Sequence, residues 1–253
     1  MWKCFANSPL RNSTKEKKMV KRETEKKSLI SWTVEQDIGF LVLDNPPGNS
    51  MTALFFDELK RLTTAITQSH IKALIITGRG RHFSSGADLE SLIAAIKTDS
   101  TGNGKPMKEA KAMLLSHALT FEFFSDLDIP VIAAIQGVCL GSALELAMHC
   151  HFRLCSNDAL LGLPETGFGL IPGVGGIQKI LQLSGKAKAI ELILKGSNFA
   201  AADACKWHIA DALFPKKELM EKAVQLAGIA VDGYRRYKKA EYLKRLTQPM
   251  TPA

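Results

Sequence analysis

The sequence predicts an α/β fold in which short buried strands alternate with amphipathic helices. Apolar runs at residues 72–77 and 131–135 have the length of buried strands and are bounded by glycine or polar residues. Apolar residues at helical spacing lie between residues 52 and 69, ahead of the first of these runs. Because a strand, a helix and a strand follow one another, we expect right-handed crossovers onto a mainly parallel sheet.

A β-hairpin is expected before the first helix. Residues 31–35 and 40–43 alternate between apolar and polar side chains around the turn Gln36-Asp37-Ile38-Gly39. Two prolines and a glycine within residues 45–49 end the second strand. Thr52 then offers a hydroxyl group that caps the helix that follows.

Further elements follow along the chain. Helices are predicted over residues 92–96, 107–126, 185–195, 200–207, 216–230 and 234–246, strands over 151–155 and 159–163, and a turn over 196–198. The polar stretch over residues 98–106, with two glycines, is predicted to be a loop.

The most informative stretch begins at Ile135. After this residue comes a tight loop bracketed by Gly137 and Gly141, and then a helix with Ser142 in its first turn. The first N–H groups of a helix have no intrahelical partner, so they suit a developing negative charge. Glu145 lies on this otherwise apolar helix, where it is either an N-terminal charge partner of the helix or a catalytic group.

Composition limits the classes of function. At 253 residues, 46% of them apolar, the chain is long enough for one large domain, or a domain with an appendage, and for a sizeable core. No apolar stretch is long enough to span a bilayer, and no signal-peptide hydrophobic region is present. The five cysteines have no paired or metal-ligand spacing, which favours free thiols in a reducing compartment. We therefore expect a cytoplasmic protein without a metal site, with Cys139 as a small buried hydrophobic residue.

Most of the net charge of +8 lies at the N-terminus. Nine basic residues oppose three acidic ones before Ser28, which leaves about +6 in that segment. Residues 1–28 are expected to be a basic disordered tail. Translation from Met19, a mitochondrial targeting presequence, which the three glutamates disfavour, and a nucleic-acid arm are the alternatives.

Three stretches, in this order along the chain, resemble the crotonase (enoyl-CoA hydratase/isomerase) family. They are HFSSGADL, IAAIQGVCLGSALELAMHCHFRLCS and LGLPETGFGLIPGVGGIQKI. The resemblance implies a crotonase-type spiral of ββα units, with an acyl-CoA site in a core over residues 29–196. It also implies that residues 197–253 form a C-terminal helical region, shorter than in relatives, that packs between the subunits of a homotrimer or hexamer.

The same resemblance implies the site residues. Glu145 and Glu165 are the catalytic pair, and the N–H groups of Ala87 and Ser142 form an oxyanion hole. Substrate contacts are implied at Ser85, Gly86, Ala87, Asp88, Leu89, Gly141 and Gly173. The family usually has glycine where this chain has Ser142, and relatives tend to have glycine where this chain has His208. No metal or redox cofactor is implied, since the coenzyme A thioester is the substrate.

Several of these residues also have a purely structural interpretation. Asp88 can cap a helix that begins at Leu89. Ser84 and Ser85 lack the G-x-S-x-G setting of a serine nucleophile. The glycine-rich loop over residues 167–176 lacks the G-K-[ST] ending of a phosphate-binding loop, so its glycines are expected to let the backbone pass close beside the site. Five apolar residues of the 107–126 helix either line an acyl tunnel or pack in the core: Met113, Leu114, Phe121, Phe123 and Phe124.

The resemblance therefore implies a hydro-lyase of fatty acid metabolism that adds water to a trans-2-enoyl-CoA to give a 3-hydroxyacyl-CoA. This reaction needs a base for water and an acid for the α-carbon, and neighbouring carboxyl groups perturb each other's pKa. We expect Glu165 to be the principal acid/base and Glu145 to position the water. The alternatives are an isomerase acting by a 1,3-proton shift, a polyketide or acyl-carrier dehydratase, and a non-catalytic CoA- or RNA-binding homologue. No membrane partner is expected.

Overall fold

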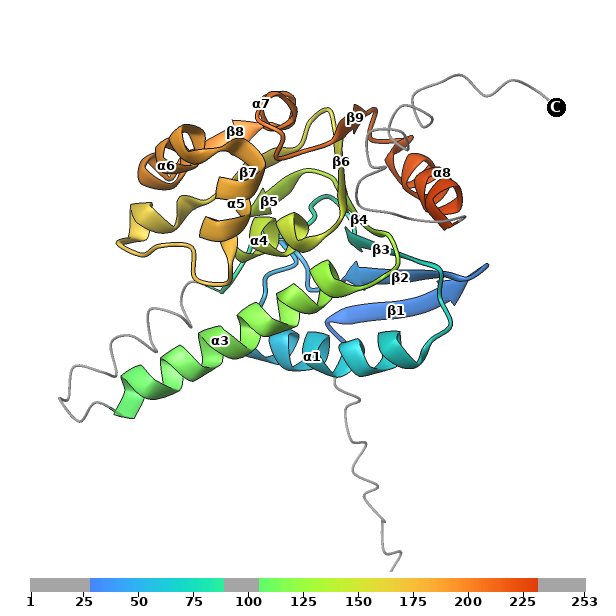
Figure 1. Ribbon diagram of the computed structural model, residues 1–253, viewed down its shortest axis with the longest axis horizontal. Coiled ribbons are helices and arrows are strands. Elements are labelled where there is room, and N and C mark those ends of the chain that lie inside the picture. The colour runs from blue at the N-terminus through green and yellow to red at the C-terminus, as the bar shows by residue number, and fades with distance from the viewer. Residues whose placement is uncertain (1–27, 89–104, 232–253) are drawn as a thin grey trace, which may run out of the picture.

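The structure, a computed structural model, describes residues 28–88 and 105–231. All but the last residue of the predicted basic tail lies outside these ranges, as do Leu89 and the helices predicted over residues 92–96 and 234–246. Figure 1 shows the described part as a twisted sheet with helices packed on both of its faces.

The described strands form two sheets, one six-stranded with the order β1-β2-β3-β4-β6-β9 and one three-stranded with the order β5-β7-β8. The strands are β1 (Ile30–Glu35), β2 (Ile38–Leu43), β3 (Ala73–Gly78), β4 (Val131–Ile135), β5 (Val138–Leu140), β6 (Phe152–Ser156), β7 (Leu160–Gly162), β8 (Asn198–Ala200) and β9 (Ala212–Phe214). All pairs from β2 to β9 in the larger sheet are parallel, which confirms the predicted mainly parallel sheet.

The described helices are α1 (Ala53–Gln68), α3 (Lys105–Asp126), α4 (Ser142–His149), the 3₁₀ helix η2 (Pro164–Phe168), α5 (Gly176–Ser184), α6 (Lys186–Lys195), α7 (Ala201–Lys206) and α8 (Leu219–Val231). Helices α1, α3, α4, α6, α7 and α8 correspond to predicted ones, with ends that differ by a few residues, whereas η2 lies where the sequence predicted a loop. The Thr52 hydroxyl accepts a hydrogen bond from the Phe55 N–H at 3.3 Å, so the predicted cap of α1 is confirmed.

Three local predictions need correction. The β1–β2 turn consists of Gln36 and Asp37 alone, both with positive φ, because a two-residue turn of this kind matches the twist of the paired strands. The stretch between Gly137 and Gly141 is the short strand β5, which pairs with β7. The last residue of the turn predicted over residues 196–198, Asn198, is the first residue of strand β8, which pairs with the other edge of β7. Pairing partners distant in sequence decide the last two cases.

Two apolar cores lie on opposite faces of the larger sheet. In β3, Leu74 and Ile76 face the core that includes Phe55 of α1, whereas Ala73 and Ile75 face the core formed with α8. Alternate residues of a strand point to opposite faces, so a strand covered on both sides reads as an unbroken apolar run. Figure 1 shows α1 and α3 on one side of the sheet and α8 on the other.

The chain alternates between the two sheets as a spiral. Each of β4 and β6 leads directly into a strand of the smaller sheet. After β5, helix α4 returns the chain to the larger sheet, and after β7 the helices η2, α5 and α6, strand β8 and helix α7 precede β9. Successive turns stack in register, β4 beside β6 and β5 beside β7. This arrangement is the expected spiral of ββα units, and it places the chain segments that leave β5 and β7 side by side.

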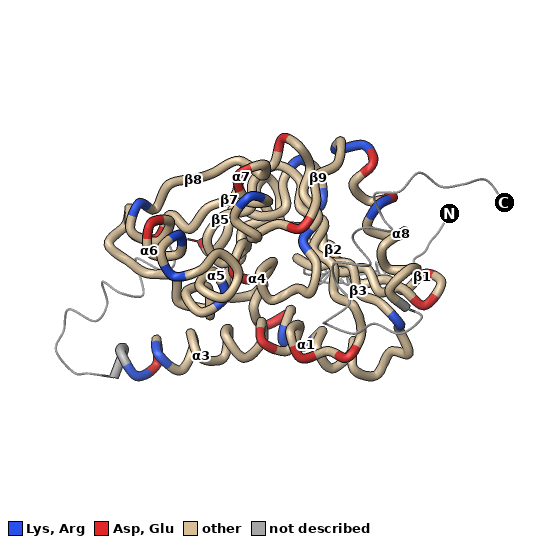
Figure 2. The backbone as a smooth tube through the Cα atoms, turned by 45° about the horizontal axis from the view of Figure 1, so that its top comes forward, with Lys and Arg blue, Asp and Glu red and all other residues tan. Residues whose placement is uncertain are grey.

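The surface of the described part carries charges of both signs. Figure 2 shows basic and acidic residues interspersed along α6 and between β9 and α8. Within residues 28–88 and 105–231, no helix is long and apolar enough to cross a membrane. The cysteines described there are free thiols, and Cys139 is fully buried in the larger core, as predicted.

Candidate active site

Two paired strands bring the two predicted catalytic glutamates together. Strands β5 and β7 are parallel neighbours with Leu140 opposite Gly162, and the Gly141 N–H donates to the Gly162 carbonyl at 2.9 Å. Helix α4, with Glu145, begins directly after β5, and η2, with Glu165, begins shortly after β7. A separation of twenty residues along the sequence therefore becomes proximity at the carboxyl ends of the two strands.

Glu145 is buried and held by backbone groups. Its side chain is 1% exposed, and its Oε1 accepts hydrogen bonds from the N–H groups of Val174 at 2.9 Å and Gly176 at 2.8 Å. Burial raises the pKa of Glu145, and these two N–H groups together with the Ser142 side chain oppose that shift. The carboxylate is therefore fixed in one orientation before any ligand arrives.

Glu165 has a different environment. Its Oε1 faces the backbone of Gly141, 3.1 Å from where a Cβ on that glycine would lie. Its Oε2 is shielded from solvent and has no hydrogen-bond partner among the described residues. Burial raises the pKa of Glu165 to about 7, and the nearby Glu145 carboxylate contributes to the shift. At neutral pH this carboxyl group can both give and accept a proton.

The glycine-rich loop lies against the helix that carries Glu145. A Cβ on Gly176 would lie 2.6 Å from Glu145 Oε1, and a Cβ on Gly175 would lie 2.9 Å from the His149 ring. At positions 175 and 176 only glycine, which has no Cβ, lets this backbone approach α4 so closely. The loop thus serves a carboxylate of the chain itself, in agreement with the predicted close passage beside the site.

The first predicted oxyanion donor has an unused N–H group. Along residues 83–88 every amide except that of Ala87 donates to a described acceptor: Phe83 to Gln136 O, Ser84 to Val138 O, Ser85 to Gly48 O, Gly86 to Ser84 Oγ and Asp88 to Met51 O. The Ala87 N–H donates to no described residue. A backbone donor left unpaired in a partly buried loop is unusual and is available for a ligand.

The second predicted donor lies close to the first. Ser142 is the first residue of α4, so its N–H has no intrahelical acceptor. Its nitrogen is 3.4 Å from where a Cβ on Gly86 would lie, and that Cβ would also lie 2.3 Å from the Leu140 carbonyl oxygen. Gly86, with φ +88°, is therefore the residue that allows the segment bearing Ala87 to approach the start of α4.

The remaining predicted contact residues are spread more widely. Ser85 is exposed beside this segment, and Gly141 is buried against Glu165. Gly173 is exposed and faces α3, since a Cβ there would lie 3.5 Å from Leu114 Cδ2. Asp88 is described, whereas Leu89 lies outside the described residues, so the predicted capping role of Asp88 stays a prediction.

Two apolar residues offered for an acyl tunnel belong to the core instead. Phe121 and Phe124 of α3 are fully buried within the larger core.

Within the described ranges, no group of three or more His, Cys, Asp or Glu side chains is arranged to hold a metal ion.

Several groups at the site were not found from the sequence. The N–H groups of Val174 and Gly176 carry no side-chain signal, and the glycine pattern indicated only a close backbone approach. Asn49 was read as part of a strand-ending run, yet its buried amide donates to three carbonyl oxygens next to the segment that carries Ala87. Its position in a proline- and glycine-rich stretch hid this role.

Comparison with known proteins identifies similar sequences. The sequence model of the family described as enoyl-CoA hydratase/isomerase matches residues 33–241. A probable enoyl-CoA hydratase of Bacillus subtilis is 36% identical over 200 residues, which cover 78% of this chain and 74% of that protein. The fatty acid oxidation complex subunit alpha of Vibrio vulnificus is 39% identical over 197 residues, 76% of this chain but only 27% of that subunit.

Solved structures show the same architecture. An enoyl-CoA hydratase from Bacillus anthracis superposes with a TM-score of 0.67 at 29% identity, covering 87% of this chain and 89% of that one. A putative enoyl-CoA hydratase from Thermobifida fusca, in complex with CoA, gives a TM-score of 0.71 at 27% identity, with coverage of 88% and 87%.

Proposed function

Since the chain belongs to the enoyl-CoA hydratase/isomerase family, we propose that it adds water to a trans-2-enoyl-CoA and yields a 3-hydroxyacyl-CoA. The observation that carries this proposal is a pair of unlike carboxyl groups beside two available N–H donors. Glu145 is fixed by the loop at Val174 and Gly176, whereas Glu165 has a shielded oxygen without a described partner.

The two N–H groups of Ala87 and Ser142 form the oxyanion hole in this proposal. When water adds to C3, the electron pair of the double bond moves towards the thioester and places negative charge on its oxygen. Two preorganised backbone donors aimed at that oxygen contribute about 3–4 kcal/mol each, by analogy with other oxyanion holes. Neither side chain takes part, so serine at position 142 serves as well as glycine.

The two carboxyl groups divide the proton transfers. The pair takes a proton from water as the C3–O bond forms, and Glu165 delivers a proton to C2, so that one water molecule is added in total. Glu165 suits this role because its pKa of about 7 populates both protonation states at neutral pH. Glu145, held at Oε1, orients the water.

Coenzyme A is proposed as the carrier of the acyl group. The similar Thermobifida fusca protein was solved with CoA and, in another structure, with acetoacetyl-CoA. We propose that Ser85, Gly86, Asp88 and Gly141, on the segments next to Ala87 and Glu165, contact the thioester portion, and that Gly173, which faces α3, contacts the substrate further away.

The second candidate is an isomerase that moves the double bond by a 1,3-proton shift. This reaction can run on one carboxyl group. One observation favours the isomerase: Oε1 of Glu145 already accepts two backbone hydrogen bonds, whereas Oε2 of Glu165 has no described partner. Glu165 is therefore the better placed of the two groups to carry a proton from one carbon to another.

The test is the hydration of crotonyl-CoA, followed as the loss of enoyl absorbance, with Glu145→Gln and Glu165→Gln beside the wild type. We expect Glu165→Gln to lower turnover by at least about 10²-fold, as is usual for the loss of a general acid–base group. Loss of activity in both variants supports the two-carboxylate hydratase. An inactive wild type that converts a 3-enoyl-CoA would refute the hydratase and support the isomerase.

A further inference from the structure

The peptide group that carries the Ala87 N–H is oriented from its other side. In a trans peptide the carbonyl and the N–H point in opposite directions. The Gly86 carbonyl accepts a hydrogen bond from the Met51 N–H at 2.8 Å, and the Asp88 N–H donates to the Met51 carbonyl at 3.2 Å. The segment around Met51 therefore fixes the direction in which the Ala87 N–H points.

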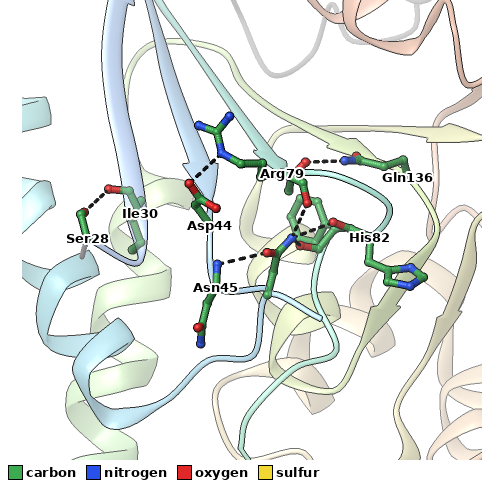
Figure 3. A network of polar contacts seen from close by, with 10 residues as sticks. Ser28, Ile30, Asp44, Asn45, Arg79, His82 and Gln136 are labelled. Carbon is green, nitrogen blue, oxygen red and sulfur yellow. Dashed lines mark hydrogen bonds and ion pairs between the residues drawn. The ribbon is translucent and has the colours of Figure 1, made fainter. Parts of the chain in front are cut away.

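The segment around Met51 is itself held by the side chain of Asn49. This side chain is 1% exposed, and its Nδ2 donates to the carbonyl oxygens of Arg79 at 3.0 Å, His82 at 2.9 Å and Phe83 at 3.2 Å. Its Oδ1 accepts from the Asn45 N–H at 3.1 Å. Figure 3 shows dashed contacts from backbone groups meeting at this point, from Asn45 on one segment and from Arg79 and His82 on another.

The Ser84 hydroxyl connects the two segments. It donates to the Asn49 carbonyl at 2.6 Å and accepts from the Gly86 N–H at 3.0 Å, and Ser84 is fully buried. The backbone of Ser84 also pairs with β5, through Ser84 N to Val138 O and Leu140 N to Ser84 O. Since β5 leads into α4, this one residue is bonded to the segments that supply both N–H donors.

We infer that Asn49 and Ser84 are positioning residues of the oxyanion hole: they hold the Ala87 N–H in the direction in which it meets the substrate's thioester oxygen. The inference rests on the proposed function, because the ligand is taken to be an acyl thioester. Neither side chain touches the substrate. Both act through the backbone, because their hydrogen bonds keep the Ala87 N–H aligned with the ligand.

Two readouts separate positioning from simple support of the fold. The first is the split between kcat and KM for hydration of crotonyl-CoA. The second is the stretching frequency of the thioester carbonyl in bound butyryl-CoA labelled with ¹³C at that carbon. Butyryl-CoA has no double bond, so it binds without being hydrated. In the wild type, donation by the oxyanion hole lowers this stretch below its value in solution.

Ser84→Ala removes both hydroxyl bonds and leaves the backbone unchanged. We expect kcat to fall roughly 10- to 100-fold, with KM altered less than about 3-fold, and the carbonyl stretch to return towards the solution value. Asn49→Gly is the second variant, because glycine tolerates the φ of +52° at this position while losing the amide. It should shift both readouts in the same direction.

The matched control is Ser156→Ala, which deletes the hydroxyl of another fully buried serine, in β6. It should leave kcat and the stretch as in the wild type. Wild-type kcat and stretch in both Ser84→Ala and Asn49→Gly would overturn the inference, as would equal changes in Ser156→Ala.

The same design separates this inference from the proposed function. A wild-type protein that lowers the carbonyl stretch but does not hydrate crotonyl-CoA refutes the hydratase, and the stretch in the variants still decides the inference. A wild-type protein that leaves the stretch unshifted refutes the oxyanion hole and the inference with it.

Discussion

Replacing Gly176 by alanine tests how closely the site depends on the glycine-rich loop. The new Cβ would lie 2.6 Å from Glu145 Oε1, 2.7 Å from Cγ and 3.0 Å from Cδ, whereas ordinary contacts begin at 3.4 Å. Glu145 is 1% exposed, and its Oε1 is held by two backbone hydrogen bonds from the same loop. The carboxylate and the loop therefore have to separate, and the hydrogen bonds from Val174 and Gly176 lengthen or break.

The size of the effect follows from this displacement. Moving a catalytic group by about 1 Å costs roughly 10²-fold in rate, and overpacking a buried site costs about 1–3 kcal/mol of stability. We therefore expect Gly176→Ala to lower kcat for crotonyl-CoA hydration by about 10²-fold. The free energy of unfolding, measured by denaturant titration, should fall by about 1–3 kcal/mol.

A matched glycine in the same region provides the control. A Cβ on Gly167 would meet nothing within 4 Å, and its φ is not in the left-handed region. Gly167→Ala should keep kcat within about twofold and change stability by less than about 1 kcal/mol. Equal kcat in Gly176→Ala, Gly167→Ala and the wild type would refute the view that the loop backbone holds Glu145.

Three further predictions concern stability. Folding raises the pKa of Glu165 from 4.5 to about 7, so the folded state binds the proton of this carboxyl group more tightly than the unfolded chain does. This tighter binding stabilises the folded state at low pH, and the stabilisation is lost as the pH rises from about 4.5 to about 7. The melting temperature of the wild type should therefore fall relative to Glu165→Gln between about pH 4.5 and pH 7, and a constant difference would contradict the assignment. Asp211→Ala leaves Arg153, 2% exposed and 3.3 Å from that carboxylate, as a buried unpaired charge, which should cost about 3–5 kcal/mol in denaturant titration. The exposed-pair control Asp203→Ala should cost less than about 1 kcal/mol, and equal losses would argue against burial as the cause. His208→Gly should raise the free energy of unfolding by about 0.5–1 kcal/mol, because His208 has φ +61°, and a loss of stability would show that its side chain contributes more than the strain costs.

Local patterns in the sequence determined the elements and the candidate residues. Apolar runs identified β3 and β4 because both faces of these strands are covered, and helical spacing with Thr52 identified α1 and its cap. Glycines marked the places where backbone segments approach each other closely, as at Gly86 and Gly176. These features are local because propensity, periodicity and capping act over a few residues.

The tertiary structure decided what each of these residues faces. Strands β5 and β8 are short and depend on pairing with β7, so the sequence alone predicted a loop and a turn in their place. The two glutamates have the same chemistry in the sequence, and only the packing of the loop made Glu145 the carboxylate bound by backbone N–H groups. The same holds for Asn49, whose amide bonds to carbonyl groups some thirty residues away. Backbone donors and long-range contacts leave no periodic signal, so the sequence determined which groups are available, and the fold determined their geometry.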